Sequence, residues 1–182
     1  MEKKLGVFRD ILDDDLEMIL NWRNAPSVRQ NMYTRHEISL EEHHRWWKVV
    51  CSRNDQRYFL YENAGTPLGV VGFTQINTSD LNSSWAFYAS PDSPRGTGSR
   101  MEFLALEKAF GEIGLHKLYC EVLDFNEPVV KLHKKFGFNV EGIFREQHQV
   151  DGDYVDVIRL GILKSEWESI REGMLVKLSS QR

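Results

Sequence analysis

The residues best able to hold a ligand through backbone chemistry form a glycine-rich loop. This loop reads Arg95-Gly96-Thr97-Gly98-Ser99 and lies between an expected strand and an expected helix. Gly96 and Gly98 lack Cβ, so the backbone can approach a ligand closely and adopt positive φ. Amides at the start of the helix and the helix dipole both attract an anion. The loop has neither the P-loop spacing nor the full dinucleotide-binding spacing, so a pyrophosphate site and a tight loop without a ligand both fit it.

A second group with chemical potential is the imidazole of His133. It follows Val129 by four residues and precedes Phe136 by three, which places it on the apolar face of an expected helix. Imidazole donates a proton readily near neutral pH. A catalytic acid and a packed structural histidine both fit this position.

The third candidate region is the stretch of residues 21–47, which is rich in aromatic and basic side chains. Aromatic faces stack on bases and sugars, and the guanidinium of Arg23 can contact a phosphate. Trp46 and Trp47 also fit simple core packing, and Met32 fits a gap-filling role. No acidic trench for a polycation is visible, which argues against a polyamine substrate.

Composition restricts the class of protein. The 182 residues are 41% hydrophobic and 27% charged, as in a folded globular chain, and predict a single domain over residues 1–182. The net charge of −4 argues against a nucleic-acid partner. No apolar stretch is long enough to cross a membrane, and no secretion signal is visible, so a cytoplasmic location is expected. Cys51 and Cys120 lack the spacing of a metal site, so no metal is expected.

The expected elements follow the order strand, two helices, three strands, helix, strand, helix and two strands. This order predicts an α/β fold with a mixed sheet and helices on both faces. Ser39 and Glu42 form a capping box at the start of the second helix. The expected strands cover residues 4–9, 58–62, 68–76, 84–89, 117–123, 138–150 and 154–163. The expected helices cover residues 16–24, 39–50, 101–113 and 128–135.

Two segments carry a resemblance to a known family. Residues 84–110 (SWAFYASPDSPRGTGSRMEFLALEKAF) and 118–138 (LYCEVLDFNEPVVKLHKKFGF) resemble the GCN5-related N-acetyltransferase (GNAT) family. The resemblance implies a sheet of about seven strands whose fourth and fifth strands splay around acetyl-coenzyme A, with a bulge in the strand before the glycine loop. His133 stands where the family usually has the Tyr that protonates the departing sulfur, and Ser93 stands where it usually has Gln or Arg. The implied cofactor-binding residues are Tyr88, Ala89, Arg95, Gly96, Thr97, Gly98, Ser99 and Asn126.

Residues 21–47 narrow the resemblance to a subfamily. Their pattern is similar to the N-acetyltransferases of bacterial pseudaminic acid biosynthesis, which serves flagellin glycosylation. That similarity implies a UDP-linked substrate, UDP-4-amino-4,6-dideoxy-N-acetyl-β-L-altrosamine, which is acetylated on its 4-amino group. The implied catalytic residues are His133 and Glu121, with Glu121 accepting a proton from the amine. The implied substrate-binding residues are Arg23, Met32, Tyr33, His43, Trp46, Tyr88 and Glu121.

The expected mechanism is direct attack of a neutral amine on the thioester, without an acyl-enzyme. A ping-pong route through Cys120 is the chemical alternative, although a mid-strand cysteine more often packs as a small apolar residue. Alternative acceptors are a ribosomal-protein N-terminus, a polyamine and an antibiotic amine, and an acyl-coenzyme A-binding module without catalysis is a further alternative. The oligomeric state stays open, with a homodimer as one possibility.

Overall fold

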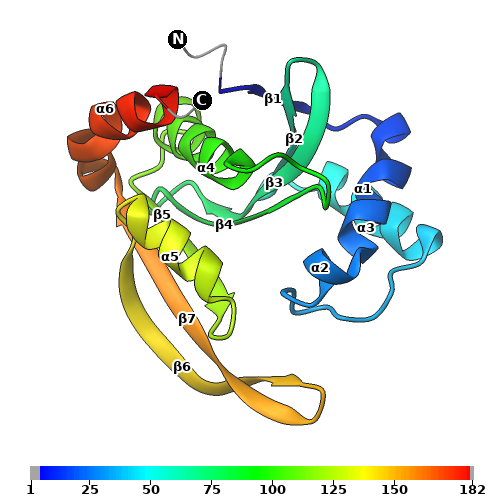
Figure 1. Cartoon of the computed structure of the whole chain (residues 1–182). Helices are drawn as coiled ribbons and strands as arrows, with labels where there is room; N and C mark the ends of the chain where they lie inside the picture. Colours follow the sequence, from blue (N-terminus) through cyan, green and yellow to red (C-terminus); the bar gives the residue numbers. More distant parts are fainter. Residues whose placement is uncertain (1–4, 181–182) are drawn as a thin grey trace.

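Seven strands form one sheet in the order β1-β2-β3-β4-β5-β7-β6 in the computed structural model, which describes residues 5–180 (Figure 1). The pair β4–β5 is parallel and every other neighbouring pair is antiparallel, so the predicted mixed sheet is confirmed. The strands are β1 (Val7–Asp10), β2 (Arg57–Asn63), β3 (Thr66–Asn77), β4 (Asn82–Ala89), β5 (Lys117–Leu123), β6 (Asn139–Val150) and β7 (Asp153–Leu163).

Helices cover both faces of the sheet, as predicted. In Figure 1 the first three helices lie to one side of the strands, while α4, α5 and α6 lie to the other. The α-helices are α1 (Leu16–Asn24), α2 (Pro26–Arg29), α3 (Leu40–Ser52), α4 (Thr97–Glu107), α5 (Glu127–Lys135) and α6 (Lys164–Ser180). A short 3-10 turn, η2 (Asp13–Asp15), precedes α1, and a π-helical turn, η3 (Lys108–Glu112), extends α4.

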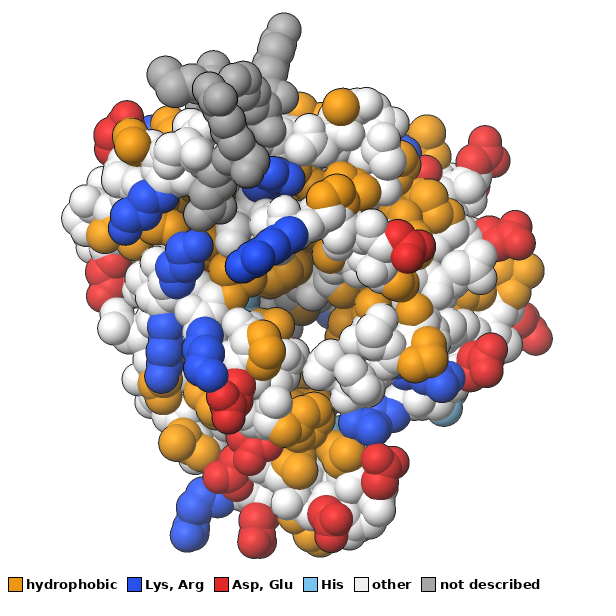
Figure 2. All heavy atoms as spheres, viewed as in Figure 1, with side chains coloured by type: hydrophobic (Ala, Val, Ile, Leu, Met, Phe, Trp, Pro, Cys, Tyr) orange, Lys and Arg blue, Asp and Glu red, His pale blue; other side chains and the backbone are white. Residues whose placement is uncertain are grey.

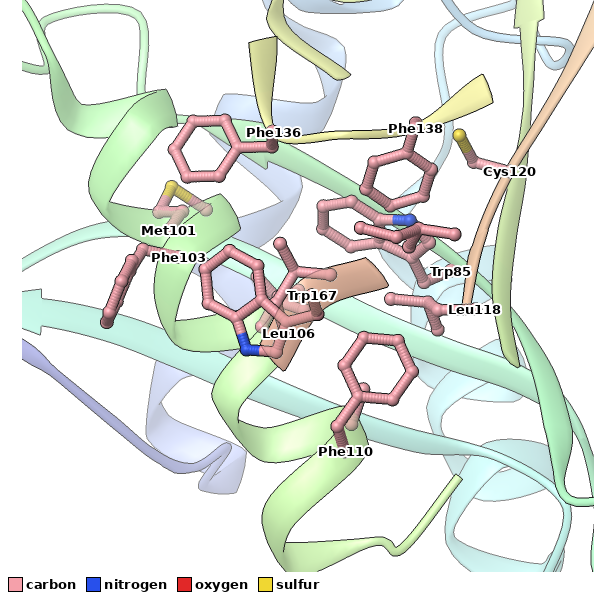
Figure 3. Packing of buried hydrophobic residues seen from close by; sticks show 14 of the residues in the cluster. Trp85, Met101, Phe103, Leu106, Phe110, Leu118, Cys120, Phe136, Phe138 and Trp167 are labelled. Atoms are coloured by element: carbon pink, nitrogen blue, oxygen red, sulfur yellow. The ribbon is translucent and has the colours of Figure 1, made fainter. Parts of the chain in front are cut away.

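The alternation of side chains along β4 divides the interior into two apolar clusters. Trp85 belongs to the larger cluster with Phe73 and Met101, which packs the sheet against α4, α5 and α6 (Figure 3). On the other side, Leu60 and Val70 form a smaller cluster with residues of α1, and Tyr88 packs against it. Successive strand residues point to opposite faces, so β4 supplies side chains to both clusters.

The strands β4 and β5 pair over a short distance and then separate. Their parallel register covers Asn82 to Ser84 of β4, although β4 continues to Ala89 and β5 continues to Leu123. Beyond Ser84 the β5-facing edge of β4 therefore carries backbone groups without a strand partner. This confirms the predicted splay of the fourth and fifth strands. The pairing of β4 with β3 is continuous from Ser84 to Ala89, so the register shows no bulge in that stretch.

Several element boundaries differ from the sequence prediction. The helix after the glycine loop begins at Thr97 rather than at residue 101, because the positive φ of Gly96 already turns the chain into the helix. Pro26–Arg29, where no helix was predicted, form the short helix α2, because proline fits the first turn of a helix. The prediction also ended at residue 163 and lacked α6. The first strand begins at Val7, and residue 4 of the predicted strand lies outside the described residues.

Candidate functional site

The gap between the splayed strands opens into a cavity of about 330 Å³. We call it the β4–β5 cavity. Figure 2 shows a hollow near the centre of the face seen in Figure 1, with Lys and Arg side chains gathered to its left. The residues that line the cavity come from α2 and the segment after it, β4, β5 and α5. The predicted site residues among them are Met32, Tyr88, Ala89, Glu121, Asn126 and His133.

The glycine loop forms a helix N-terminus suited to an anion. Gly96 occupies the N-cap position of α4 with φ of 89°, a conformation that strains any residue with a Cβ. The amides of Gly98 and Ser99 lie in the first turn of the helix, where no intrahelical acceptor exists. Thr97 is different, because its amide and hydroxyl both donate to the carbonyl of Pro94, at 3.1 and 2.7 Å. Thr97 therefore holds the loop, and Gly96, Gly98 and Ser99 remain for a ligand.

Two further predicted cofactor residues occupy exposed or cavity-lining positions. Arg95 is exposed, next to the helix N-terminus. Asn126 caps α5 through its backbone carbonyl, which accepts hydrogen bonds from the amides of Val129 and Val130. Its side chain makes no capping hydrogen bond and lines the β4–β5 cavity.

His133 lies in the wall of the β4–β5 cavity and is almost fully buried. Its Nδ1 lies 2.8 Å from Oε1 of Glu102 on α4, whose exposed fraction is 0%. The rings of Trp85, Phe87 and Phe138 surround the imidazole, with centroids 5.4, 6.0 and 5.1 Å away. A buried ion pair inside an aromatic cage is unusual for a helix that only packs against a sheet.

The charge state of this pair follows from burial and mutual attraction. Burial alone lowers the pKa of the His133 imidazolium, but Glu102 attracts the cation and accepts its hydrogen bond, and the pKa rises to about 10. Burial also raises the pKa of the Glu102 carboxyl, against the opposing effect of His133. The two groups therefore hold one proton between them across the neutral range.

A second cavity of about 310 Å³ lies on the other face of β4, against α1 and α3. We call it the α1–α3 cavity. Its walls are largely aromatic, since Trp46 stacks on His43 at 5.0 Å and meets the edge of Tyr58 at 5.1 Å. Met32, Tyr88 and their neighbours Ala86 and Phe87 line both cavities. The two cavities therefore meet at β4 and beside Met32.

Two buried nitrogen atoms in the α1–α3 cavity lack partners. Nη1 of Arg23 and Nε2 of His43 have no hydrogen-bond partner among residues 5–180. The other arm of the guanidinium donates from Nη2 to the carbonyl of Thr34 at 2.9 Å. Burial lowers the pKa of Arg23 and, with help from the nearby His44, lowers the pKa of His43. Arg23 stays charged at its intrinsic basicity, so the cavity holds one cation with an unused donor.

The loop between α2 and α3 carries Met32 and Tyr33 and is anchored at the end that leads into α3. Asn24 donates to the carbonyl of Ile38 and accepts from its amide, both at 2.8 Å. The predicted capping box is half formed, because Ser39 Oγ accepts from the amide of Glu42 while the Glu42 carboxylate contacts His36 instead. These contacts fix the path of the loop across the molecule.

Tyr33 reaches from this loop to β5. Its hydroxyl donates to Oε2 of Glu121 at 3.2 Å, and Oε1 of the same carboxylate accepts from Arg159 at 3.1 Å. The ring of Tyr33 meets the edge of His148 at 4.9 Å. Burial and the negative charge of Glu121 raise the pKa of Tyr33 to about 12, so the phenol stays protonated. Tyr33 itself lines neither cavity.

The structure thus divides the predicted substrate residues between two places. Arg23, His43 and Trp46 lie together in the α1–α3 cavity, and Glu121 lies in the β4–β5 cavity with Tyr33 at its rim. Sequence reasoning missed Glu102, Tyr58, His148 and Arg159. The one sequence signal for Glu102 is a lone acid within the apolar stretch Met101–Leu106. His148 Nε2 is also buried without a partner in the described part of the chain.

Residues 5–180 contain no group of three or more His, Cys, Asp or Glu placed to hold a metal ion. Across the same residues, no helix combines the length and the apolar character that crossing a bilayer requires.

Comparisons with known proteins identify relatives over most of the chain. The family described as the acetyltransferase (GNAT) domain matches residues 8–158. The acetyltransferase PseH of Campylobacter jejuni strain 81-176 is 28% identical over 137 residues, which cover 75% of this chain and 85% of that protein. The spermidine N(1)-acetyltransferase of Escherichia coli K12 is 26% identical over 161 residues, which cover 87% and 86%.

A solved structure agrees with the fold. The crystal structure of spermidine N-acetyltransferase from Vibrio cholerae in complex with CoA and spermine superposes with a TM-score of 0.83. The identity is 27%, and the match covers 89% of this chain and 97% of that chain. The relatives therefore agree on acetyl transfer, and spermidine is named as the substrate of some of them.

Proposed function

The chain belongs to the GNAT family of acetyltransferases and is an N-acetyltransferase with acetyl-coenzyme A as co-substrate, and we propose that its acceptor is the amine of a UDP-linked amino sugar. The specific acceptor proposed is the 4-amino group of UDP-4-amino-4,6-dideoxy-N-acetyl-β-L-altrosamine. Its acetylation is a step of pseudaminic acid biosynthesis for flagellin glycosylation. The similarity to PseH over 75% of the chain supports this choice.

The observation that carries the proposal is the unpaired Nη1 of Arg23 in the α1–α3 cavity. A buried donor on a charged group is costly to leave without a partner. The diphosphate of a nucleotide sugar supplies oxygen acceptors and opposite charge, so binding removes that cost. A polyamine supplies further positive charge and leaves the same donor unpaired.

The remaining walls of the α1–α3 cavity suit a base or a sugar ring. Trp46 and Tyr58 present aromatic faces and edges within one cavity, and such surfaces stack on planar bases and on the apolar face of a sugar. The neutral His43 adds a buried nitrogen that accepts or donates one hydrogen bond. The proposed acceptor site therefore combines stacking surfaces with one cationic contact.

The amine is proposed to react where the two cavities meet. Tyr88 lines both cavities, and Glu121 also lines the β4–β5 cavity, with Tyr33 and Arg159 donating to its two oxygens. Glu121 accepts a proton from the attacking amine, directly or through water. Its two hydrogen bonds fix the direction of the carboxylate, so positioning supplies part of the rate.

The donor is proposed to occupy the β4–β5 cavity. The free amides of Gly98 and Ser99 bind the pyrophosphate, and Asn126 and the unpaired edge of β4 near Ala89 bind the pantetheine arm. His133, at the cavity wall, donates a proton to the departing sulfur. Bound acetyl-coenzyme A supplies the thioester, and the rest of the catalysis is positioning and proton transfer by this chain.

Polyamine acetylation is the second candidate function, because spermidine acetyltransferases match 87% of the chain at similar identity. A polycation needs unpaired carboxylates at its binding site. The acids that line the two cavities already have partners, since Glu42 contacts His36 and Glu121 contacts Tyr33 and Arg159. We therefore rank this acceptor second, ahead of a ribosomal-protein N-terminus or an antibiotic amine.

The test is an acceptor panel with acetyl-coenzyme A that includes the UDP-amino sugar, spermidine, an N-terminal peptide and an aminoglycoside. The proposal expects the UDP-amino sugar to give the largest kcat/KM. In the variant Arg23→Gln this kcat/KM falls roughly 10- to 100-fold, because a hydrogen bond to a charged group is lost, while KM for acetyl-coenzyme A stays unchanged.

Arg45→Gln is the matched control, because Arg45 lies on the exposed side of α3 and its ion-pair partner within residues 5–180 is Glu41. It should leave both constants unchanged. A preference of the wild-type protein for spermidine, or an Arg23→Gln variant with full activity on the UDP-amino sugar, would contradict the proposed acceptor.

A further inference from the structure

Glu102 is a carboxyl group in the middle of the main apolar cluster. It follows Met101 and precedes Phe103 on α4, and all three side chains are buried. Its Oε1 contacts His133, but its Oε2 is buried without a partner within residues 5–180. Replacing a buried ion pair by apolar residues is often neutral or stabilising. Packing alone therefore gives no reason for an acid at this position.

We propose that Glu102 is a positioning residue, which holds the ring of His133 so that Nε2 keeps a proton and presents it to the β4–β5 cavity. This inference rests on the proposed function, in which His133 protonates the departing sulfur. It adds a second residue to that step, from an element 31 positions earlier in the chain.

The geometry decides which nitrogen is available. Nδ1 lies 2.8 Å from Glu102 Oε1, so Nε2 is the nitrogen left for the cavity that His133 lines together with Cys120, whose side chain also interacts with the imidazole. If the pair is an imidazolium and a carboxylate, both nitrogens carry a proton. If the acid form of Glu102 donates to Nδ1, the neutral ring carries its proton on Nε2. In both arrangements Nε2 is a donor.

The surroundings of the pair leave Glu102 as the main charged contact of the ring. The imidazole contacts the rings of Trp85 and Phe87 on β4 and of Phe138, which directly precedes β6, so these contacts are aromatic. β5 contributes the thiol of Cys120, which also raises the pKa of His133. Lys135, at the end of α5, acts on Glu102 from a distance and lowers the pKa of its carboxyl. The surrounding aromatic rings restrict rotation of the imidazole, and Glu102, by pairing with Nδ1, keeps a proton on Nε2.

The proton transfer balances without any further reagent. As the amine nitrogen forms its bond to the acetyl carbon, the carbon–sulfur bond breaks and the electron pair stays on sulfur. The proton on His133 Nε2 passes to that sulfur, which gives the free thiol of coenzyme A. The ring is left neutral, with its proton on Nδ1 donated to the Glu102 carboxylate. The proton released by the amine leaves through Glu121 to solvent, and solvent restores the proton of the pair.

The first test measures the pair without any acceptor. Nitrogen NMR of the whole protein, labelled at histidine, follows His133 through a pH titration and should show a pKa far above the ordinary 6.5. In Glu102→Gln the volume is kept and the negative charge is lost, so burial should lower this pKa below the ordinary value. Coenzyme A added to the wild-type protein should shift the Nε2 resonance of His133.

The second test measures turnover. Glu102→Gln and Glu102→Met should each lower kcat roughly 10- to 100-fold, since a general acid contributes about that much or more, with KM for acetyl-coenzyme A within about twofold. The alkaline limb of the kcat profile should move to lower pH in both variants. His133→Tyr should restore turnover in the Glu102→Gln background, because a phenol carries its own proton and needs no carboxylate.

Glu107→Gln is the matched control on the same helix. Glu107 is also a paired acid of α4, but its partners are Trp167 and Arg171, outside both cavities. This variant should lose stability and keep both kcat and the pKa of His133. A purely structural role for Glu102 predicts that Glu102→Gln also loses stability and keeps kcat.

The outcomes separate this inference from the proposed function. An ordinary or low wild-type pKa of His133, or kcat within twofold of wild type in both Glu102 variants, would overturn the role of Glu102. A raised pKa that falls in Glu102→Gln, together with the Nε2 shift on adding coenzyme A, would support that role even if the UDP-amino sugar were not acetylated. In that case only the proposed acceptor would be wrong.

Discussion

The proposed donor site takes its pyrophosphate contacts from backbone amides, whereas the α1–α3 cavity takes its polar contacts from side chains. The amides after Gly96 lie at the N-terminus of α4, and the unpaired edge of β4 lines the β4–β5 cavity with the side chains of Glu121, Asn126 and His133. In the α1–α3 cavity, Arg23 and Trp46 come from helices outside the sheet and point toward β4. Backbone groups stay in place when side chains change, so the donor site can be shared by proteins that differ in acceptor. The difference allows related proteins to share acetyl transfer while their acceptors vary.

The most decisive test of the division between the two cavities is a substitution of Glu121. This residue lines the β4–β5 cavity, while its carboxylate accepts a hydrogen bond from Tyr33 on the loop between α2 and α3. Glu121→Gln keeps the shape of the side chain but removes the proton acceptor, so kcat should fall at least about 100-fold. KM for acetyl-coenzyme A should stay within about twofold. Steady-state kinetics with both substrates varied measures the two effects separately.

Glu141→Gln is the control for this substitution. Glu141 also lies near Arg159, at 4.0 Å, and pairs with Lys117, but it lines neither cavity. Its amide variant should keep kcat. If Glu121→Gln kept kcat as well, proton removal would not involve this carboxylate, and the acceptor side would act by binding alone.

A smaller effect is expected at the backbone of the donor site. Gly96 has φ of 89°, and a residue with a Cβ in this conformation costs roughly 1–2 kcal/mol. Gly96→Ala should therefore raise KM for acetyl-coenzyme A by about 5- to 30-fold as the loop relaxes away from its geometry. KM for the acceptor should change little, because Gly96 is not part of the α1–α3 cavity.

Gly114→Ala is the control that separates the effect of backbone strain on stability from an effect on ligand binding. Gly114 has φ of 76° with open space around it, and it lies far along the chain from the loop. Its alanine variant should lower the melting temperature to a similar degree without changing either KM. Equal changes of both KM values in Gly96→Ala would break the division between the two cavities.

The predictions on the donor side rest on local features of the sequence. The glycine loop, the strand before it and Asn126 are local features, and their spacing within the chain carries their meaning. The order of the elements predicted the mixed sheet, and the family resemblance implied the splay of β4 and β5. The missing helix α6 had a usable signal, since Trp167, Met174 and Leu178 recur at helical spacing and are buried.

The acceptor side and the Glu102–His133 pair were less predictable because they depend on tertiary distance. No spacing rule links residue 102 to residue 133, and only the packing of α4 against α5 brings them to 2.8 Å. Similarly, the sequence indicated Arg23 as a phosphate contact but not that one arm of it is buried and unpaired. The contact between Tyr33 and Glu121, which are 88 positions apart, depends on a loop whose path the composition does not specify.

The smallest expected effect concerns the ion pair between Arg35 and Asp151. It joins the acceptor loop to the turn between β6 and β7, with 3.0 Å between Arg35 Nη2 and Asp151 Oδ2. Asp151 is 80% exposed, and exposed ion pairs contribute about 0–1 kcal/mol. Asp151→Asn should therefore raise KM for the acceptor by no more than about fivefold and leave KM for acetyl-coenzyme A unchanged.

Two measurements separate the ion pair from the backbone contact that Arg35 also makes. One is the dependence of KM on ionic strength, and the other is a double-mutant cycle that combines Arg35→Ala with Asp151→Asn. Arg35 donates to the carbonyl of Gln30 at 2.7 Å, so Arg35→Ala should have a larger effect than Asp151→Asn. The difference between wild type and Asp151→Asn should disappear at high ionic strength, because screening weakens exposed pairs. An effect of either variant on acetyl-coenzyme A would show that the loop also shapes the β4–β5 cavity, through Met32, and that the two cavities respond as one site.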